Sequence, residues 1–214
     1  ALGLLLFKPQ YALPMLALLL IRGEWTVGLV TAAVGGVEYL AGAAVAGWSW
    51  PTRLADAIRF FAAEERVANG PTLISLPEWF DFNLGAGSVG LIAAALLCVA
   101  VAVAWWRTRA ERRFAAPWAL AVCAILLASL HTQHYDVAVL LLPALLLLDD
   151  RLRSGRPVTP AGRLALLAAY FAYPTFLLGR TLGIQPLVLL PVAALAWAAV
   201  EMRGAKLAVR PRGT

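Results

Sequence analysis

The sequence predicts an all-α membrane protein, a polytopic bundle of about seven transmembrane helices. Hydrophobic residues make up 62% of the 214 residues and charged residues 14%, and the mean hydropathy is +0.78. Soluble domains average roughly 45–50% apolar and about 25% charged residues. A globule of this size cannot hide so much apolar surface, so the composition places the chain in a bilayer.

Seven apolar segments carry this prediction, because a bilayer core of about 30 Å needs about 20 helical residues. Cys98 and Cys123 fall inside such segments, which predicts small buried hydrophobes and no disulfide. We expect all the segments to belong to one transmembrane domain over residues 1–214. The predicted helices lie at about 9–22, 26–49, 87–106, 115–130, 135–150, 163–181 and 184–202.

The Lys and Arg residues lie mainly in alternate gaps between these segments. Thirteen of the 18 fall in four gaps, at 22–25, 107–113, 149–163 and from 201 onward. By the positive-inside rule these gaps are cytoplasmic and the others face outside. The same distribution accounts for the net charge of +6, so we expect membrane lipids as partners and no nucleic acid. The prediction is a multi-pass protein of the plasma membrane whose site faces outside.

The longest outward gap, 51–86, has a pattern of its own. Ser49 and Pro51 form a helix-start signal, and residues 51–66 are apolar along one helical face for two turns. This favours an amphipathic helix on the outer membrane surface. An ordinary loop helix without a functional role is the alternative.

The first and fifth segments look too short to cross a membrane. From Pro9 to Ile21 there are 13 residues and from Val137 to Leu148 there are 12, which reach only about 18–20 Å at 1.5 Å per residue. Either they take in neighbouring turns, or they begin below the outer surface, inside a cavity. In the second case their N–H groups and positive dipole ends point into a recessed, outward-facing site.

The polar residues at the first of these helix starts suit an anionic ligand. Lys8 precedes Pro9, a residue favoured in a first helical turn. An ammonium beside helix N–H groups is an anchor for phosphate, and Gln10 can add hydrogen-bond donors for phosphate or sugar hydroxyls. The alternative is a Lys8 that reaches to the membrane surface from one continuous helix kinked at Pro9.

The second start holds both histidines of the chain. His131 and His134 are three residues apart, and Tyr135 and Asp136 follow. Residues three apart share a helical face, and an Asp near a His can orient the imidazole or raise its pKa. We expect catalysis or substrate binding here; a plain polar turn is the alternative. Two His and one Asp match no strong metal-ligand spacing, so we predict neither metal nor cofactor.

Two further polar residues are secondary candidates. Arg180 lies at the outward end of the sixth segment and can contact phosphate, or it can reach to the interface like many membrane arginines. Glu38 falls in the middle of the second segment, where an acid is a candidate for function or a paired structural residue.

The runs around these clusters resemble the family 87 glycosyltransferases, also called DUF2029. The similar runs are FKPQYALP at 7–14, LLLIRGEW at 18–25, and HYDV at 134–137 leading into LLLPAL at 140–145. The order of elements is also similar over about residues 1–150: a helix pair, a long outward loop, another pair, then the His-Tyr-Asp turn.

The resemblance implies a bundle of the GT-C class and a membrane hexosyltransferase. Such enzymes move a sugar, often mannose, from a polyprenyl-phosphate carrier to a lipid-linked or cell-envelope glycan on the outer face. It implies that Lys8 contacts the donor phosphate, with Arg180 as a second cation. His134 would contact phosphate or sugar and Asp136 would orient it, while Gln10, His131 and Tyr135 would line the pocket.

The chain opens in an apolar run without Met, so we expect the C-terminal part of a longer protein. In GT-C enzymes the general base is usually an acid of the first outward loop, which we expect upstream of this chain. The rival function is a secondary transporter or flippase domain for a lipid-linked or anionic solute, with Lys8, Glu38 and His134 as relay groups. A non-catalytic membrane subunit is the third possibility.

Overall fold

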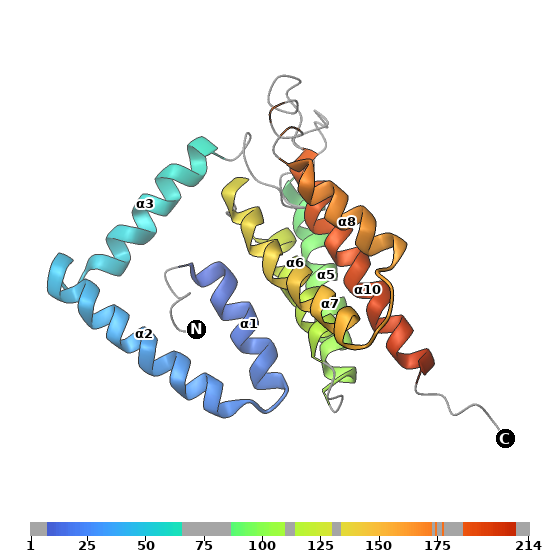
Figure 1. The fold of residues 1–214 in the computed structure, drawn as a ribbon. Helices are drawn as coiled ribbons and strands as arrows, with labels where there is room; N and C mark the ends of the chain where they lie inside the picture. Colours follow the sequence, from blue (N-terminus) through green and yellow to red (C-terminus); the bar gives the residue numbers. More distant parts are fainter. Residues whose placement is uncertain are drawn as a thin grey trace. The chain divides into compact units, whose positions relative to one another are not determined.

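A computed structural model of the chain describes residues 8–65, 87–109, 114–129, 134–172, 174, 177 and 186–208. Within these ranges the fold is all-helical, with eight α-helices and two 3₁₀ helices (Figure 1). Contacts between residues divide the chain into two units, 1–69 and 70–214. The prediction of a single transmembrane domain stays a prediction, and each unit is described by itself.

The first unit begins with a helical hairpin, α1 (Pro9–Ile21) and α2 (Trp25–Ala46), whose two helices pack together. The connection is a Schellman turn. Gly23, at φ +85°, donates its N–H to the Leu20 carbonyl, and Glu24 donates to Leu19. Glycine adopts this left-handed backbone without steric cost, so α1 stops sharply and the chain reverses.

Helix α2 is apolar along its whole length but is mostly exposed. Leu29 is 75% exposed and Val45 is 90% exposed, and only Thr31 and Ala43 of this helix are buried. A core helix of a soluble protein hides such side chains, whereas a membrane span turns them to lipid. The chain then continues into α3 (Trp50–Glu65), the amphipathic helix predicted for the outward gap.

In its described residues, the second unit is a bundle of five α-helices built around α6 (Ala115–Ala128). Helix α6 packs against α5 (Gly87–Arg107), α7 (Leu141–Arg153) and α10 (Leu189–Ala208). Helix α8 (Pro160–Tyr170) packs on the other side of α10 (Figure 1). Every α6 residue from 119 to 127 is buried, so α6 forms the core of this unit.

Two helices of the bundle start in the same way. Helix α7 opens with Leu141-Leu142-Pro143 after the 3₁₀ helix η2 (His134–Leu140), and α10 opens with Leu189-Leu190-Pro191 after η3 (Pro186–Val188). Proline lacks an N–H and its ring clashes with the carbonyl four residues earlier. The preceding turns therefore tighten into 3₁₀ geometry instead of extending the α-helix.

The structure confirms the all-α class and differs from the sequence prediction in two respects. The fifth predicted segment is not one α-helix from residue 135, because Pro143 makes its first turns 3₁₀. Moreover, two of the described helices are long and apolar enough to span a membrane, Trp25–Ala46 and the Gly90–Arg107 part of α5. Helices α1 and α6 are apolar but shorter. The count of seven spans stays a prediction.

Candidate functional site

The first predicted cluster lies at the start of α1. Lys8 is the residue that caps this helix, and its backbone carbonyl accepts from the Tyr11 N–H at 3.0 Å. The Lys8 ammonium lies 5.8 Å from the centroid of the Tyr11 ring, a cation–π distance. Lys8 and Gln10 are half-buried, and Tyr11 is buried. The predicted helix start at Pro9 is confirmed, and with 13 residues α1 is as short as expected.

The second cluster forms the first turn of η2. His134, Tyr135 and Asp136 open this seven-residue 3₁₀ helix, and runs longer than three or four residues are uncommon in 3₁₀ geometry. Asp136 is 4% exposed, although carboxylates are rarely buried without a specific reason. His131 and Arg180 lie outside the described residues.

Helices α5 and α6 of the second unit differ in length beyond a shared contact. Trp105 of α5 contacts the rings of Phe114 and Trp118, which begin α6, so the two helices are level there. From that level, α5 continues to Gly87 and α6 to Ala128. At 1.5 Å per residue α6 ends roughly 10 Å short of α5. Ser129, the residue directly after α6, is buried.

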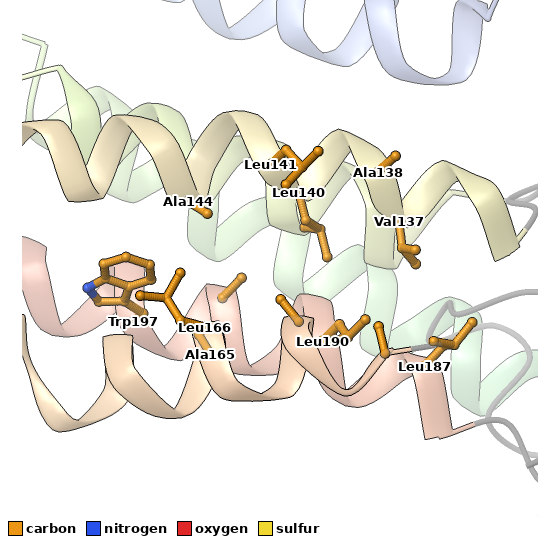
Figure 2. A pocket seen from close by; sticks show the side chains of 13 residues that line it. Val137, Ala138, Leu140, Leu141, Ala144, Ala165, Leu166, Leu187, Leu190 and Trp197 are labelled. Carbon is orange, nitrogen blue, oxygen red and sulfur yellow. The ribbon is translucent and has the colours of Figure 1, made fainter. Parts of the chain in front are cut away.

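An apolar pocket of about 530 Å³ begins directly after Asp136 (Figure 2), a size typical of small-ligand sites. Its walls come from η2 and α7, from α8, and from η3 and α10. Every lining side chain is aliphatic except that of Trp197. The lining residues are Val137, Ala138, Leu140, Leu141, Ala144, Ala165, Leu166, Ala169, Ala172, Leu187, Leu190, Ala194 and Trp197.

The pocket has two different ends. Val137 and Leu187 lie at one end, and Trp197 lies at the opposite end beside Ala144 and Ala165 (Figure 2). Trp197 is fully buried. The lining therefore extends from Val137, the residue after Asp136 in the chain, to the indole ring of Trp197.

Behind Trp197 lies a buried ion pair. The indole Nε1 donates to Glu201 Oε1 at 2.9 Å, and the Arg151 guanidinium binds the same carboxylate at 2.6–2.8 Å. The two side chains are 11% and 4% exposed. Arg151 also donates to the Pro157 carbonyl at 3.1 Å. This bidentate pairing satisfies both charges and fixes α7 to α10.

Helix α8 approaches the same indole through a glycine. Thr159 caps α8 by accepting from the Gly162 N–H at 3.2 Å, and Pro160 suits the first helical position. A Cβ added at Gly162 would lie 2.6 Å from Trp197 Cε2, closer than atoms can pack. Only glycine lets the α8 backbone rest on the ring.

The predicted site residues therefore lie in different parts of the structure. Lys8 and Gln10 belong to the first unit and Asp136 to the second, so their shared pocket stays a prediction. Glu38 is half-buried on α2. In the described ranges no three His, Cys, Asp or Glu side chains come together in a group that could hold a metal ion.

Sequence reasoning missed the apolar pocket. Its lining consists of residues that look like ordinary membrane-helix residues in the sequence. The repeated Leu-Leu-Pro at 141–143 and 189–191 is the one available signal, because both copies start helices that line the pocket.

Together, the exposed apolar helices and the apolar pocket describe an all-α protein with candidate membrane spans and an internal apolar cavity. Comparison with known proteins makes this class specific. The model of glycosyltransferase family 87 matches residues 1–132, so the chain belongs to this family of membrane-bound transferases. No curated protein and no solved structure matches the chain. The match includes Lys8, Gln10 and His131 and ends before η2 and the pocket.

Proposed function

We propose that the protein moves a sugar, mannose, from a polyprenyl-phosphate carrier to a lipid-linked or cell-envelope glycan on the outer face of the plasma membrane. The observation that carries the donor class is the apolar pocket. It starts at Val137, one residue after the buried Asp136. A polyprenyl phosphate has the same division, with a charged head joined to a branched hydrocarbon chain.

The reaction is a direct displacement with inversion at the anomeric carbon. The acceptor hydroxyl oxygen bonds to that carbon, while the bond to the carrier phosphate breaks and its electron pair leaves with the phosphate. A base takes the hydroxyl proton. Charge then grows on the departing phosphate, where cations and N–H donors lower the barrier.

In this proposal each polar residue of the two clusters has a role. Lys8 binds the carrier phosphate, with Arg180 as a second cation. His134 donates to phosphate or sugar, and Asp136 holds the imidazole in position. Gln10, His131 and Tyr135 complete the polar end of the pocket. The half-buried position of Lys8 and the burial of Asp136 support these roles, because burial strengthens electrostatic interactions.

A transporter needs a path that reaches both membrane faces. The described pocket is apolar and stops at Trp197, in front of the Arg151–Glu201 pair. This favours a transferase over the transporter or flippase alternative.

Transfer of labelled mannose from a polyprenyl-phosphate donor, measured with the enzyme in membranes, tests the proposal. Lys8→Ala is expected to lower the rate by about 10²-fold or more, since it removes charge stabilisation of the leaving phosphate. Lys8→Arg keeps the charge and is expected to keep most of the rate. Asp136→Asn is expected to lower the rate by about 10²-fold.

The matched control for Asp136→Asn is Asp149→Asn, at an exposed carboxylate on the far end of α7. It is expected to leave transfer unchanged. Wild-type protein that uses a nucleotide sugar but no polyprenyl-phosphate sugar would refute the donor class. Unchanged turnover in Lys8→Ala and Asp136→Asn at normal expression would refute the site.

A further inference from the structure

The closed end of the apolar pocket differs from its walls. Twelve of the lining side chains are Val, Ala or Leu, and the remaining one is the indole of Trp197 (Figure 2). The Val and Leu side chains can change rotamer and the Ala side chains leave space, whereas a large planar ring that is held in place blocks a ligand. We propose that Trp197 is the end wall of the pocket and sets how many isoprene units of the donor the enzyme holds. This inference rests on the proposed function.

Two sets of contacts keep the ring from turning away. On one edge the indole N–H donates to Glu201 Oε1 at 2.9 Å, and Arg151 holds that carboxylate through both of its oxygens. Around the ring, α8 lies so close that a methyl at Gly162 would contact Cε2 at 2.6 Å and Nε1 at 2.8 Å. The ring therefore has a fixed position, set by α7, α8 and α10 together.

The position of Trp197 sets the length of the pocket. Leu187 and Trp197 mark its two ends on η3 and α10. They are ten residues apart in the chain, which corresponds to roughly 15 Å at about 1.5 Å per residue. A few isoprene units fill this distance. A longer carrier chain must leave the pocket sideways into lipid when it meets Trp197.

The number of isoprene units that the pocket holds can be measured, because the surrounding lipid does not itself drive binding. Lipid tails are as apolar as leucine, so a prenyl chain gains nothing from merely leaving the bilayer. It gains through close packing with the lining side chains, which adds up over many contacts. Each isoprene unit inside the pocket therefore adds contacts, and each unit beyond Trp197 adds none.

The experiment measures kcat/KM for a series of mannosyl donors that differ by one isoprene unit, with the enzyme in membranes. Wild-type kcat/KM is expected to rise with each unit and then to level off. Trp197→Ala opens space behind the wall, so the levelling point is expected to move to a longer donor by at least one unit. Ala194→Phe fills the pocket ahead of the wall and is expected to move it to a shorter donor.

Two features of this experiment distinguish a role of Trp197 in donor specificity from a structural role. Val200→Ala, on an exposed side of the same helix, is the control and is expected to leave the levelling point in place. Ala194→Phe leaves Trp197 and its partners intact, so it carries the test if Trp197→Ala does not fold. If both variants lower kcat/KM by one common factor for all donors, with the levelling point unmoved, the wall has no such role.

Failure of the inference and failure of the proposed function give different results. A wild-type enzyme that uses no polyprenyl donor of any length overturns both. A wild-type series that levels off at a length that neither Trp197→Ala nor Ala194→Phe shifts overturns only the role of Trp197.

Discussion

The two ends of the second helix bundle use polar residues in different ways. At the α10 side of the pocket's closed end, Arg151 and Glu201 neutralise each other and hold helices together. At the open end, Asp136 is buried in a tight 3₁₀ turn that a proline imposes. Charges in the first place contribute to stability, and we propose that those in the second contribute to chemistry. Similar residue types thus have different roles, set by what packs around them.

Breaking the Arg151–Glu201 pair is expected to have the largest effect on stability. Glu201→Ala leaves the Arg151 guanidinium buried without its partner and removes the acceptor of the Trp197 N–H. Loss of one member of a buried pair typically costs about 3–5 kcal/mol. The measurement is the midpoint of thermal unfolding in detergent, followed by circular dichroism.

Arg153→Ala is the matched control for that experiment. Arg153 pairs with Asp149 one turn away, but these side chains are 80% and 55% exposed. Solvent screens such an exposed pair and it contributes little to stability, so the midpoint is expected to change little. Equal shifts for both variants would mean that the buried pair has no special structural role.

The 3₁₀ turn that holds Asp136 is tested by replacing Pro143. Pro143→Ala restores an N–H and removes the clash with the Val139 carbonyl, so η2 is expected to become α-helical. Its seven residues would then shorten by roughly 3–4 Å, because the rise per residue falls from about 2.0 to 1.5 Å. Asp136 would move, and a misplaced site group can cost about 10²-fold in rate.

The control is Pro191→Ala, the same change at the start of α10. It relaxes η3 but leaves η2 in place, so the loss of transfer is expected to be smaller. Retention of full activity in Pro143→Ala would show that the 3₁₀ turn does not position the site.

The smallest of these effects concerns the contact between α8 and the indole. Gly162→Ala places a methyl 2.6 Å from Trp197 Cε2 and 2.8 Å from Val158 Cγ1. Overpacking of this kind costs about 1–3 kcal/mol, measured again by thermal unfolding. Gly36→Ala, where the added methyl meets nothing within 4 Å, is expected to stabilise α2 by about 0.5–1 kcal/mol. A Gly162→Ala protein as stable as wild type would disprove the tight approach.

The sequence was sufficient for the fold class and for the ends of α1. Helix α1 starts at Pro9 as predicted and ends within one residue of the prediction, at Ile21. Helix α8 covers Pro160–Tyr170 and not the predicted 163–181, because Thr159 caps it and Pro160 suits its first position. The family follows from short motifs around Lys8 and His134, and the family match over 1–132 confirms it.

What the sequence lacks is information about partners far apart in the chain. Arg151 and Glu201 are fifty positions apart, and each looks like an ordinary charged residue at a helix end. The sequence analysis did not predict the 3₁₀ form of residues 134–140, because a proline at the third position of a helix usually leaves the α-helix intact. Here the seven residues before α7 are themselves helical, in 3₁₀ form. The Ala and Leu residues that line the pocket lie on several helices, and their sequence pattern does not indicate a pocket.

The central place of α6 has a consequence for biosynthesis. This helix is enclosed by α5, α7 and α10, and α10 leaves the ribosome after the other described helices of this unit. Until then one side of α6 faces lipid or a chaperone rather than its final neighbour. Chains stopped before Leu189 are therefore expected to insert into the membrane yet to remain sensitive to proteases, and completion of α10 closes the bundle.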